Sequence, residues 1–428
     1  MHYSVAVVGG GQSGLSVSYC LQTQGIDHVV FEQHKVAHSW RTKRWDTFCL
    51  VTPNWQCTLP GYTYDDYSGE DPNGFMPREQ IVEYVEHYAK SFDSPLREGV
   101  TVRRLRKGAN FELMTSAGEF TADQVVVATG SYHRPKIPAI AERLPADMVQ
   151  IHSSEYRNPE SLPAGAVLVV GSGQSGCQIA EDLHLAGRRV HLAIGSAPRS
   201  PRRYRGKDVV EWLDLMGYYD MPIDEHPEKE KVRSKTNHYL TGRDGGREID
   251  LRQFALEGMQ LYGRLKDIES ASDGGQMRFQ PNLAENLDQA DAVAQSIKRT
   301  VNKFIAAQGI NEPVEPDYEP VRQPNPAPKR LDYRAANITS VIWSIGYGMD
   351  FSWIDIPVFD GKGYPGHRRG VTDCYGLYFI GLPWLYTWGS GRFSGVARDA
   401  QYIADTIAAR KIGVSPLLQI VNEAALGS

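Results

Sequence analysis

The stretch "VVGGGQSGLSVSYCL" at positions 7–21 returns almost unchanged as "VVGSGQSGCQIAEDL" at 169–183. Each copy ends an apolar, β-type run, carries a G-x-G-x-x-G turn and continues into helix-like sequence. Strand, glycine turn and helix in this order are the parts of a dinucleotide-binding unit. The repeat therefore predicts an α/β fold with two Rossmann-like dinucleotide-binding domains.

The first copy carries every part of such a site. Gly9 allows a tight turn, Gly11 lets the backbone reach a pyrophosphate, and Gly14 lets helix and strand pack closely. The helix that follows offers free N–H groups to the phosphates. The next apolar run ends in Glu32, 23 residues after Gly9, where a carboxylate can accept hydrogen bonds from ribose hydroxyls. The residues expected at this first cofactor site are Gly9, Gly11, Gln12, Ser13, Gly14 and Glu32.

The second copy lies 162 residues later and lacks the acid, because Ile194 takes the place of Glu32. Arginines follow at 199, 202, 203 and 205. Arginine binds phosphate with charge-assisted hydrogen bonds, so this site suits the 2′-phosphate of NADPH and the first site suits FAD. A solvated basic loop is the alternative for these arginines. The residues expected at the second site are Gly171, Gly173, Gln174, Ser175, Gly176, Arg199 and Arg202, and which arginine binds the 2′-phosphate stays open.

Composition narrows the class of protein. The 428 residues carry a formal net charge of -5, and no apolar run reaches the length of a membrane span. We therefore expect neither a nucleic-acid nor a membrane partner. Five cysteines form no C-x-x-C pair, and an apolar run already begins at Tyr3, so we expect a reducing, cytoplasmic setting without a signal peptide.

The order of segments predicts nested domains. An FAD-binding domain takes residues 1–160, is interrupted by an NADPH-binding domain at 161–324 and is completed at 325–428. The runs "VTVRRL", "NFELMT" and "FTADQVVVATG" between the two copies predict a small meander of strands. Residues 251–279 read as strands and turns, 284–308 as a helix, and about 395–409 as a final helix.

Several short motifs resemble class B flavin-dependent monooxygenases, the family of flavin-containing, YUCCA-type and Baeyer–Villiger monooxygenases. They are the two glycine turns, "HSW" at 38–40, "LVTPN" at 50–54, "VVVATG" at 125–130, "HSSEY" at 152–156, "WSIGY" at 343–347 and "GLYFIGLPWL" at 376–385. The resemblance covers nearly the whole chain. The ending "TWGSGRFSGVARDA" at 387–400 is also similar to bacterial flavin-dependent oxidoreductases encoded beside nitrilase genes.

This resemblance implies an FAD- and NADPH-dependent monooxygenase that inserts one oxygen atom from O2 into a small organic substrate through a C4a-peroxyflavin. It implies Trp40, Arg41, Thr129 and Gly130 as further cofactor-binding residues and Asn54 as the catalytic residue, with no metal. A turn asparagine and a surface arginine are the alternatives for Asn54 and Arg41. A flavin-dependent NADPH reductase and a non-catalytic NADPH-sensing regulator remain alternative functions, and a homodimer is one open choice for the oligomeric state.

Overall fold

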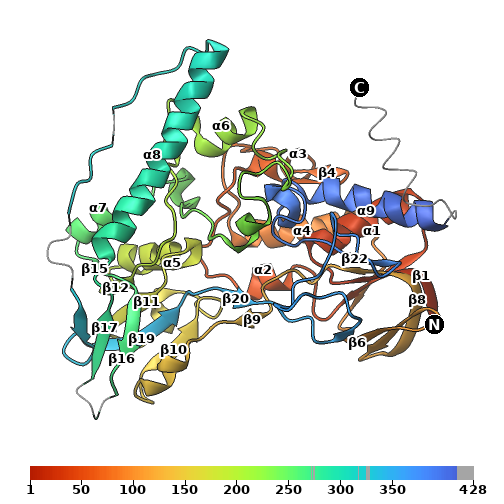
Figure 1. The fold of residues 1–428 in the computed structure, drawn as a ribbon, viewed down its shortest axis with the longest axis horizontal. Helices are drawn as coiled ribbons and strands as arrows, with labels where there is room; N and C mark the ends of the chain where they lie inside the picture. The colour runs from red at the N-terminus through yellow and green to blue at the C-terminus, as the bar shows by residue number, and fades with distance from the viewer. Residues whose placement is uncertain (271, 273–274, 317, 324–327, 412–428) are drawn as a thin grey trace.

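The computed structural model describes residues 1–270, 272, 275–316, 318–323 and 328–411. The chain forms two α/β units that lie side by side, each with its own sheet (Figure 1). The predicted fold class is confirmed, because strands of the second sheet lie between two groups of first-sheet strands along the sequence.

The first sheet has eight strands in the order β21-β6-β7-β8-β1-β2-β5, with β22 also paired to β8. Strands β5, β2, β1, β8 and β22 are parallel neighbours, whereas β6, β7 and β8 form the predicted antiparallel meander. The strands are β1 (His2–Val8), β2 (His28–Glu32), β5 (Leu96–Glu98), β6 (Val102–Lys107), β7 (Phe111–Thr115), β8 (Gly118–Val127), β21 (Ile354–Asp355) and β22 (Leu377–Phe379).

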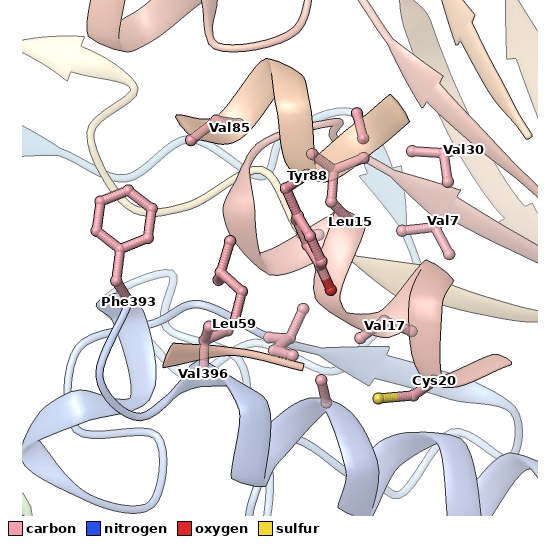
Figure 2. Packing of buried hydrophobic residues seen from close by; sticks show 14 of the residues in the cluster. Val7, Leu15, Val17, Cys20, Val30, Leu59, Val85, Tyr88, Phe393 and Val396 are labelled. Carbon is pink, nitrogen blue, oxygen red and sulfur yellow. The ribbon is translucent and has the colours of Figure 1, made fainter. Parts of the chain in front are cut away.

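Three helices cover one face of this sheet: α1 (Gln12–Thr23), α4 (Arg78–Ser91) and α9 (Val396–Lys411). Leu15 and Val17 from α1 pack with Tyr88 from α4 and Val396 from α9, as Figure 2 shows. The final helix predicted at about 395–409 is confirmed as α9, and its Val396, Ile403 and Ile407 are fully buried. This packing joins α9 to α1, the helix that begins at the first glycine turn.

The second sheet is parallel throughout, in the order β10-β19-β11-β12-β15. Helices α5 (Gln174–Leu185) and α8 (Leu283–Gln308) cover one face, and a three-stranded antiparallel sheet, β16-β17-β18, packs on the other. The strands are β10 (Val149–His152), β11 (Ala166–Val170), β12 (Val190–Ala193), β15 (Gln260–Tyr262), β16 (Leu265–Ile268), β17 (Gln276–Phe279), β18 (Arg330–Asp332) and β19 (Ile338–Trp343).

The second sheet extends beyond the expected 161–324 segment at both ends. Strand β10 lies before residue 161 and strand β19 after residue 324, yet both pair within this sheet. The chain crosses between the units along β9 (Arg134–Pro135) and β20 (Tyr347–Gly348), which pair with each other. We therefore propose that the inserted domain runs from β9 to β20, which is wider than the predicted 161–324 segment, because short apolar runs do not reveal their pairing partners.

One predicted strand region begins as a helix. Residues 251–256 form α7 (Leu251–Leu256), because the Asp250 side chain accepts hydrogen bonds from the first free N–H groups, those of Arg252 and Gln253. The predicted strands follow it as β15, β16 and β17. The predicted helix at 284–308 is confirmed as α8.

The remaining elements are short. They are α2 (His38–Thr42), η1 (Asn54–Gln56), β3 (Thr58–Leu59), β4 (Tyr62–Thr63), α3 (Tyr64–Tyr67), η2 (Ala139–Arg143), η3 (Pro159–Ser161), β13 (Arg203–Tyr204), β14 (Lys207–Asp208), α6 (Val209–Leu215), η4 (Lys229–Ser234), η5 (Arg243–Gly245) and η7 (Trp388–Gly391). Of the helices in the described ranges, none has the length and apolar character needed to cross a bilayer.

Candidate cofactor sites

The first glycine turn joins β1 to α1 and has three glycines with three different surroundings. Gly9 has a φ of 111°, and a Cβ there would lie 2.6 Å from the carbonyl oxygen of Ala128. A Cβ at Gly14 would lie 1.9 Å from the carbonyl oxygen of Gly9. A Cβ at Gly11 would meet no atom within 4 Å. Gly9 and Gly14 are thus required for the close backbone packing of the turn. Gly11 instead faces open space in which a phosphate fits.

Glu32 stands beside this turn at the end of β2. Its Oε2 accepts a hydrogen bond of 2.8 Å from the backbone N–H of Gly10, and its Oε1 accepts one of 2.9 Å from that of His34. Each carboxylate oxygen has two lone pairs, so each keeps one for a ligand. The half-buried carboxylate therefore lies where a ribose on this turn would need an acceptor.

Two other segments close around the same turn. Thr129 directly follows Ala128, and its buried Oγ1 has no hydrogen-bond partner among the described atoms. A Cβ at Gly381 would lie 2.4 Å from Oγ of Ser13, so the C-terminal segment reaches the start of α1. A buried hydroxyl without a partner costs free energy, which a hydrogen bond from a bound cofactor would offset. The residues present therefore fit a dinucleotide at this turn.

The structure brings most of the residues expected at the first site together. Gly9, Gly11, Gln12, Ser13, Gly14 and Glu32 surround the turn, and Thr129 and Gly130 follow the neighbouring strand β8. Gln12 also points its Nε2 toward the carbonyl oxygen of Gly391, 3.5 Å away. Gly130 has a φ of 74°, a backbone conformation that favours glycine.

The second glycine turn repeats this geometry at the start of α5. Gly171 has a φ of 107°, and a Cβ at Gly176 would lie 1.9 Å from its carbonyl oxygen. A Cβ at Gly173 would meet only Cγ2 of Thr236, at 3.5 Å. Helices α1 and α5 both begin without a side-chain cap, so their first N–H groups stay available at the turn. Gln174 and Ser175 open α5, half-buried and exposed respectively.

The two sites differ at the end of the strand that follows the helix. In the first, the carboxylate of Glu32 holds the N–H of Gly10. In the second, Ser172 occupies the place of Gly10, and its Oγ accepts a hydrogen bond of 3.0 Å from the N–H of Gly195. A Cβ at Gly195 would meet no atom within 4 Å. The second strand end therefore presents open space beside Gly195, with Ile194 at the position that the carboxylate of Glu32 takes in the first copy.

The structure does not offer Arg199 as a phosphate ligand. Its side chain is 4% exposed and pairs with Glu248 at 2.6 Å and Asp291 at 2.7 Å, over the ring of Tyr318. Burial alone would lower the pKa of this guanidinium, but Glu248 and Asp250 raise it above its ordinary value. Because carboxylates already neutralise it, we propose that Arg199 does not bind the 2′-phosphate, contrary to the sequence-based expectation.

Arg202 is also buried and paired within the protein. It is 2% exposed, pairs with Asp208 at 2.5 Å and donates a hydrogen bond of 2.7 Å to the carbonyl oxygen of Val51.

A different arginine, Arg264, lies near the second strand end and has no ion-pair partner among the described residues. It follows β15, the neighbour of β12, and its guanidinium is exposed. Sequence reasoning missed Arg264, because only the pairing of β12 with β15 brings it near Ile194.

Trp40 and Arg41 take different directions on helix α2. The ring of Trp40 stacks on that of Phe393, with centroids 5.6 Å apart, so it does join the C-terminal segment. Arg41 instead pairs with Glu86 and is half exposed, which matches the alternative of a surface arginine.

Arg44 lies over the rings of Trp40 and Phe48, at 5.1 Å and 5.4 Å, and has no carboxylate partner among the described residues. Burial lowers the pKa of its guanidinium.

Asn54 is 3% exposed and serves its own loop. Its Nδ2 donates to the carbonyl oxygen of Asp71 at 2.9 Å, and its Oδ1 accepts from the N–H of Met76 at 2.7 Å. The turn alternative is thus supported, and only one N–H of the amide remains for a ligand. Two residues on, Gln56 is equally buried, and its Oε1 has no partner among the described atoms. Nothing in the sequence distinguished Gln56 from its neighbours.

Comparison with known proteins decides the family. The family model of pyridine nucleotide-disulphide oxidoreductases matches residues 6–242. The chain belongs to this family. It is 32% identical over 408 residues to an uncharacterized CzcO-like oxidoreductase of Geobacillus kaustophilus, covering 94% of this chain and 97% of that one. Membership confirms the predicted enzyme class, a flavin-dependent oxidoreductase, and the predicted cofactors, FAD and NADPH.

Two further likenesses confirm the resemblance to flavin-dependent monooxygenases. The chain is 30% identical over 233 residues to a probable indole-3-pyruvate monooxygenase, YUCCA3 of Arabidopsis thaliana, covering 51% of this chain and 52% of that one. Its fold matches a flavin-containing monooxygenase from Stenotrophomonas maltophilia with a TM-score of 0.63 at 17% identity, over 96% of this chain and 99% of the other.

Proposed function

We propose that the protein is an FAD- and NADPH-dependent monooxygenase that inserts one oxygen atom from O2 into a small organic substrate, at nitrogen, sulfur or carbon. The observation that carries this proposal is the pair of glycine turns with opposite strand ends. The first ends in the carboxylate of Glu32 and the second in the open space beside Gly195. One chain thus offers separate places for a flavin nucleotide and for a phosphorylated nicotinamide nucleotide.

The cysteines support oxygen rather than a disulfide as the electron acceptor. All five are free, and Cys20, Cys57 and Cys177 are buried. Burial raises the pKa of Cys20 to about 12 and that of Cys49 to about 11, so neither is a thiolate at neutral pH. The named relatives that are monooxygenases point the same way. Free thiols also agree with the cytoplasmic setting that we propose.

The roles of this chain's residues follow from their positions. Gly9, Gly11 and the first N–H groups of α1 would hold the pyrophosphate of FAD, with Glu32 on its ribose and Thr129 donating or accepting at its buried hydroxyl. Gly171, Gly173 and Gly176 would hold NADPH in the same way, and Arg264 its 2′-phosphate. Bound FAD would supply hydride acceptance from NADPH and the activation of O2.

The C-terminal segment would keep water away from the first turn. Residues 381–393 touch Ser13, Gln12 and Trp40 and bury Phe393 in the core of the first unit. A site closed by apolar and aromatic side chains protects reactive species from water. The segment is held from the other unit too, because the N–H of Ile223 donates to the carbonyl oxygen of Tyr386 at 2.7 Å.

The test is turnover with isotopically labelled oxygen. The FAD-loaded protein is mixed with NADPH, ¹⁸O2 and a panel of small amines, sulfides and organic acids, and each product is examined by mass spectrometry. One labelled oxygen atom in a product is expected. NADPH oxidation with no label in any product would replace the proposal with the reductase alternative, and no NADPH oxidation at all would favour the regulator.

A further inference from the structure

Arg392 occupies a distinct position beside both glycine turns. It follows η7, whose last residue, Gly391, lies 3.5 Å from Gln12 Nε2 at the start of α1. Its own Nη2 donates a hydrogen bond of 3.0 Å to Oδ1 of Asn237. The neighbouring Thr236 is the residue whose Cγ2 would lie 3.5 Å from a Cβ at Gly173. The side chain thus bridges a segment at the first turn and a segment at the second.

The charge of Arg392 is not neutralised within the protein. Its guanidinium lies 3.7 Å from the ring centroid of Trp388, and its Nη1 donates to the carbonyl oxygen of the same residue. No carboxylate of the described chain pairs with it. Two nearby arginines do have acids, since Arg398 pairs with Asp220 and Arg233 with Glu230. A guanidinium carries five N–H donors, so Arg392 keeps donors for a further partner.

The Trp388 ring that lies against Arg392 belongs to a cluster of aromatic rings. The rings of Trp388 and Tyr219 are 4.7 Å apart, and those of Tyr218 and Trp384 are 6.3 Å apart. Burial lowers the pKa of Arg392, which means that its charged form has lost hydration. A cation that is desolvated without a counter-charge is costly, and an incoming anion offsets the cost. Tyr218, Tyr219, Trp388 and Arg392 are all half-buried, so each keeps part of its surface open to a ligand.

We propose that Arg392 binds the carboxylate of the substrate, and that the substrate is a small organic acid whose apolar or aromatic body packs on Trp388, Tyr218 and Tyr219. Guanidinium and carboxylate match in geometry and form paired, charge-assisted hydrogen bonds. The aromatic rings supply the apolar contact that such a body needs. Calling the ligand the substrate rests on the proposed monooxygenase function, whereas the binding itself does not.

The cofactors also carry anions, so the experiment separates the two sources. Phenylacetate and its uncharged analogue phenylacetamide serve as probes, and their affinities for the FAD-loaded protein are measured by calorimetry. NADP⁺ is titrated in parallel. We expect phenylacetate to bind at least about tenfold more tightly than phenylacetamide. Arg392→Gln should abolish this preference, Arg392→Lys should keep part of it, and the affinity for NADP⁺ should stay within about twofold.

Arg398→Gln is the matched control, because this arginine lies six residues further on and already pairs with Asp220. It should leave the preference for phenylacetate unchanged. FAD content and melting temperature establish that each variant is folded. Equal affinity for acid and amide in the unchanged protein overturns the proposal, as does a loss of NADP⁺ binding in Arg392→Gln without a loss for phenylacetate. Because binding is measured without turnover, its failure is distinct from a failure of the monooxygenase assay.

Discussion

Gly11 and Gly14 of the first turn should respond to an added methyl group in different ways. Gly11 has a φ of -78°, which alanine adopts freely, and its Cβ would meet no atom within 4 Å. Gly11→Ala should therefore leave the cofactor-free protein as stable as before, or more stable by about 0.4–1 kcal/mol through the unfolded chain. The methyl group would occupy the space expected for the pyrophosphate. Losing one charge-assisted hydrogen bond, about 1.5–3 kcal/mol, weakens FAD binding roughly tenfold to a hundredfold.

Gly14→Ala is the matched control in the same turn. Its Cβ would lie 1.9 Å from the carbonyl oxygen of Gly9, so α1 must shift, at a cost of about 1–3 kcal/mol. Urea denaturation of the cofactor-free variants measures stability, and fluorescence titration with FAD measures affinity. Wild-type FAD affinity in Gly11→Ala would refute the reasoning, and so would a greater loss of stability in Gly11→Ala than in Gly14→Ala.

Four other outcomes are expected. Arg199→Gln should lower the free energy of unfolding by about 3–5 kcal/mol, since buried carboxylates lose their cation, yet leave the preference for NADPH over NADH unchanged. Arg264→Gln should weaken NADP⁺ binding about tenfold and spare NAD⁺, as titration of both would reveal. Gly173→Val should keep its flavin but no longer be reduced by NADPH, followed by flavin absorbance. Burial raises the pKa of Asp399 from 3.8 to about 6, so the folded protein binds more protons between these values and stability falls as the pH rises through them. Asp399→Asn should flatten this fall in urea denaturation at several pH values.

The two turns could be predicted from sequence because their geometry is local. Gly9 and Gly171 have a φ near 110°, and a Cβ at Gly14 or Gly176 would lie 1.9 Å from the carbonyl oxygen of the turn, so these positions at fixed spacing have room for glycine alone. The carboxylate of Glu32 belongs to the same short unit, so its place beside the turn followed as well. A site whose residues all belong to one strand, one turn and one helix can be predicted from sequence in this way.

The fate of the arginines could not be predicted, because it depends on residues far along the chain. Arg199 meets Glu248 and Asp291, which are 49 and 92 positions away. The sequence around Arg199 contains no signal that identifies these partners. The same limit applies to β10 and β19, whose apolar runs predict strands but not the sheet that they join.

The two copies fix the glycine turn to the following strand by hydrogen bonds of opposite direction. Each glycine turn must be tied to the end of the following strand, and in the first copy the acid of that strand accepts from the N–H of Gly10. In the second copy the donor and acceptor exchange sides, because the hydroxyl of Ser172 on the turn accepts from the N–H of Gly195 beyond the strand. The exchange ties the turn without a negative charge. Having isoleucine instead of an acid at position 194 therefore destabilises the fold little. It also leaves space for a phosphate, which a carboxylate would repel.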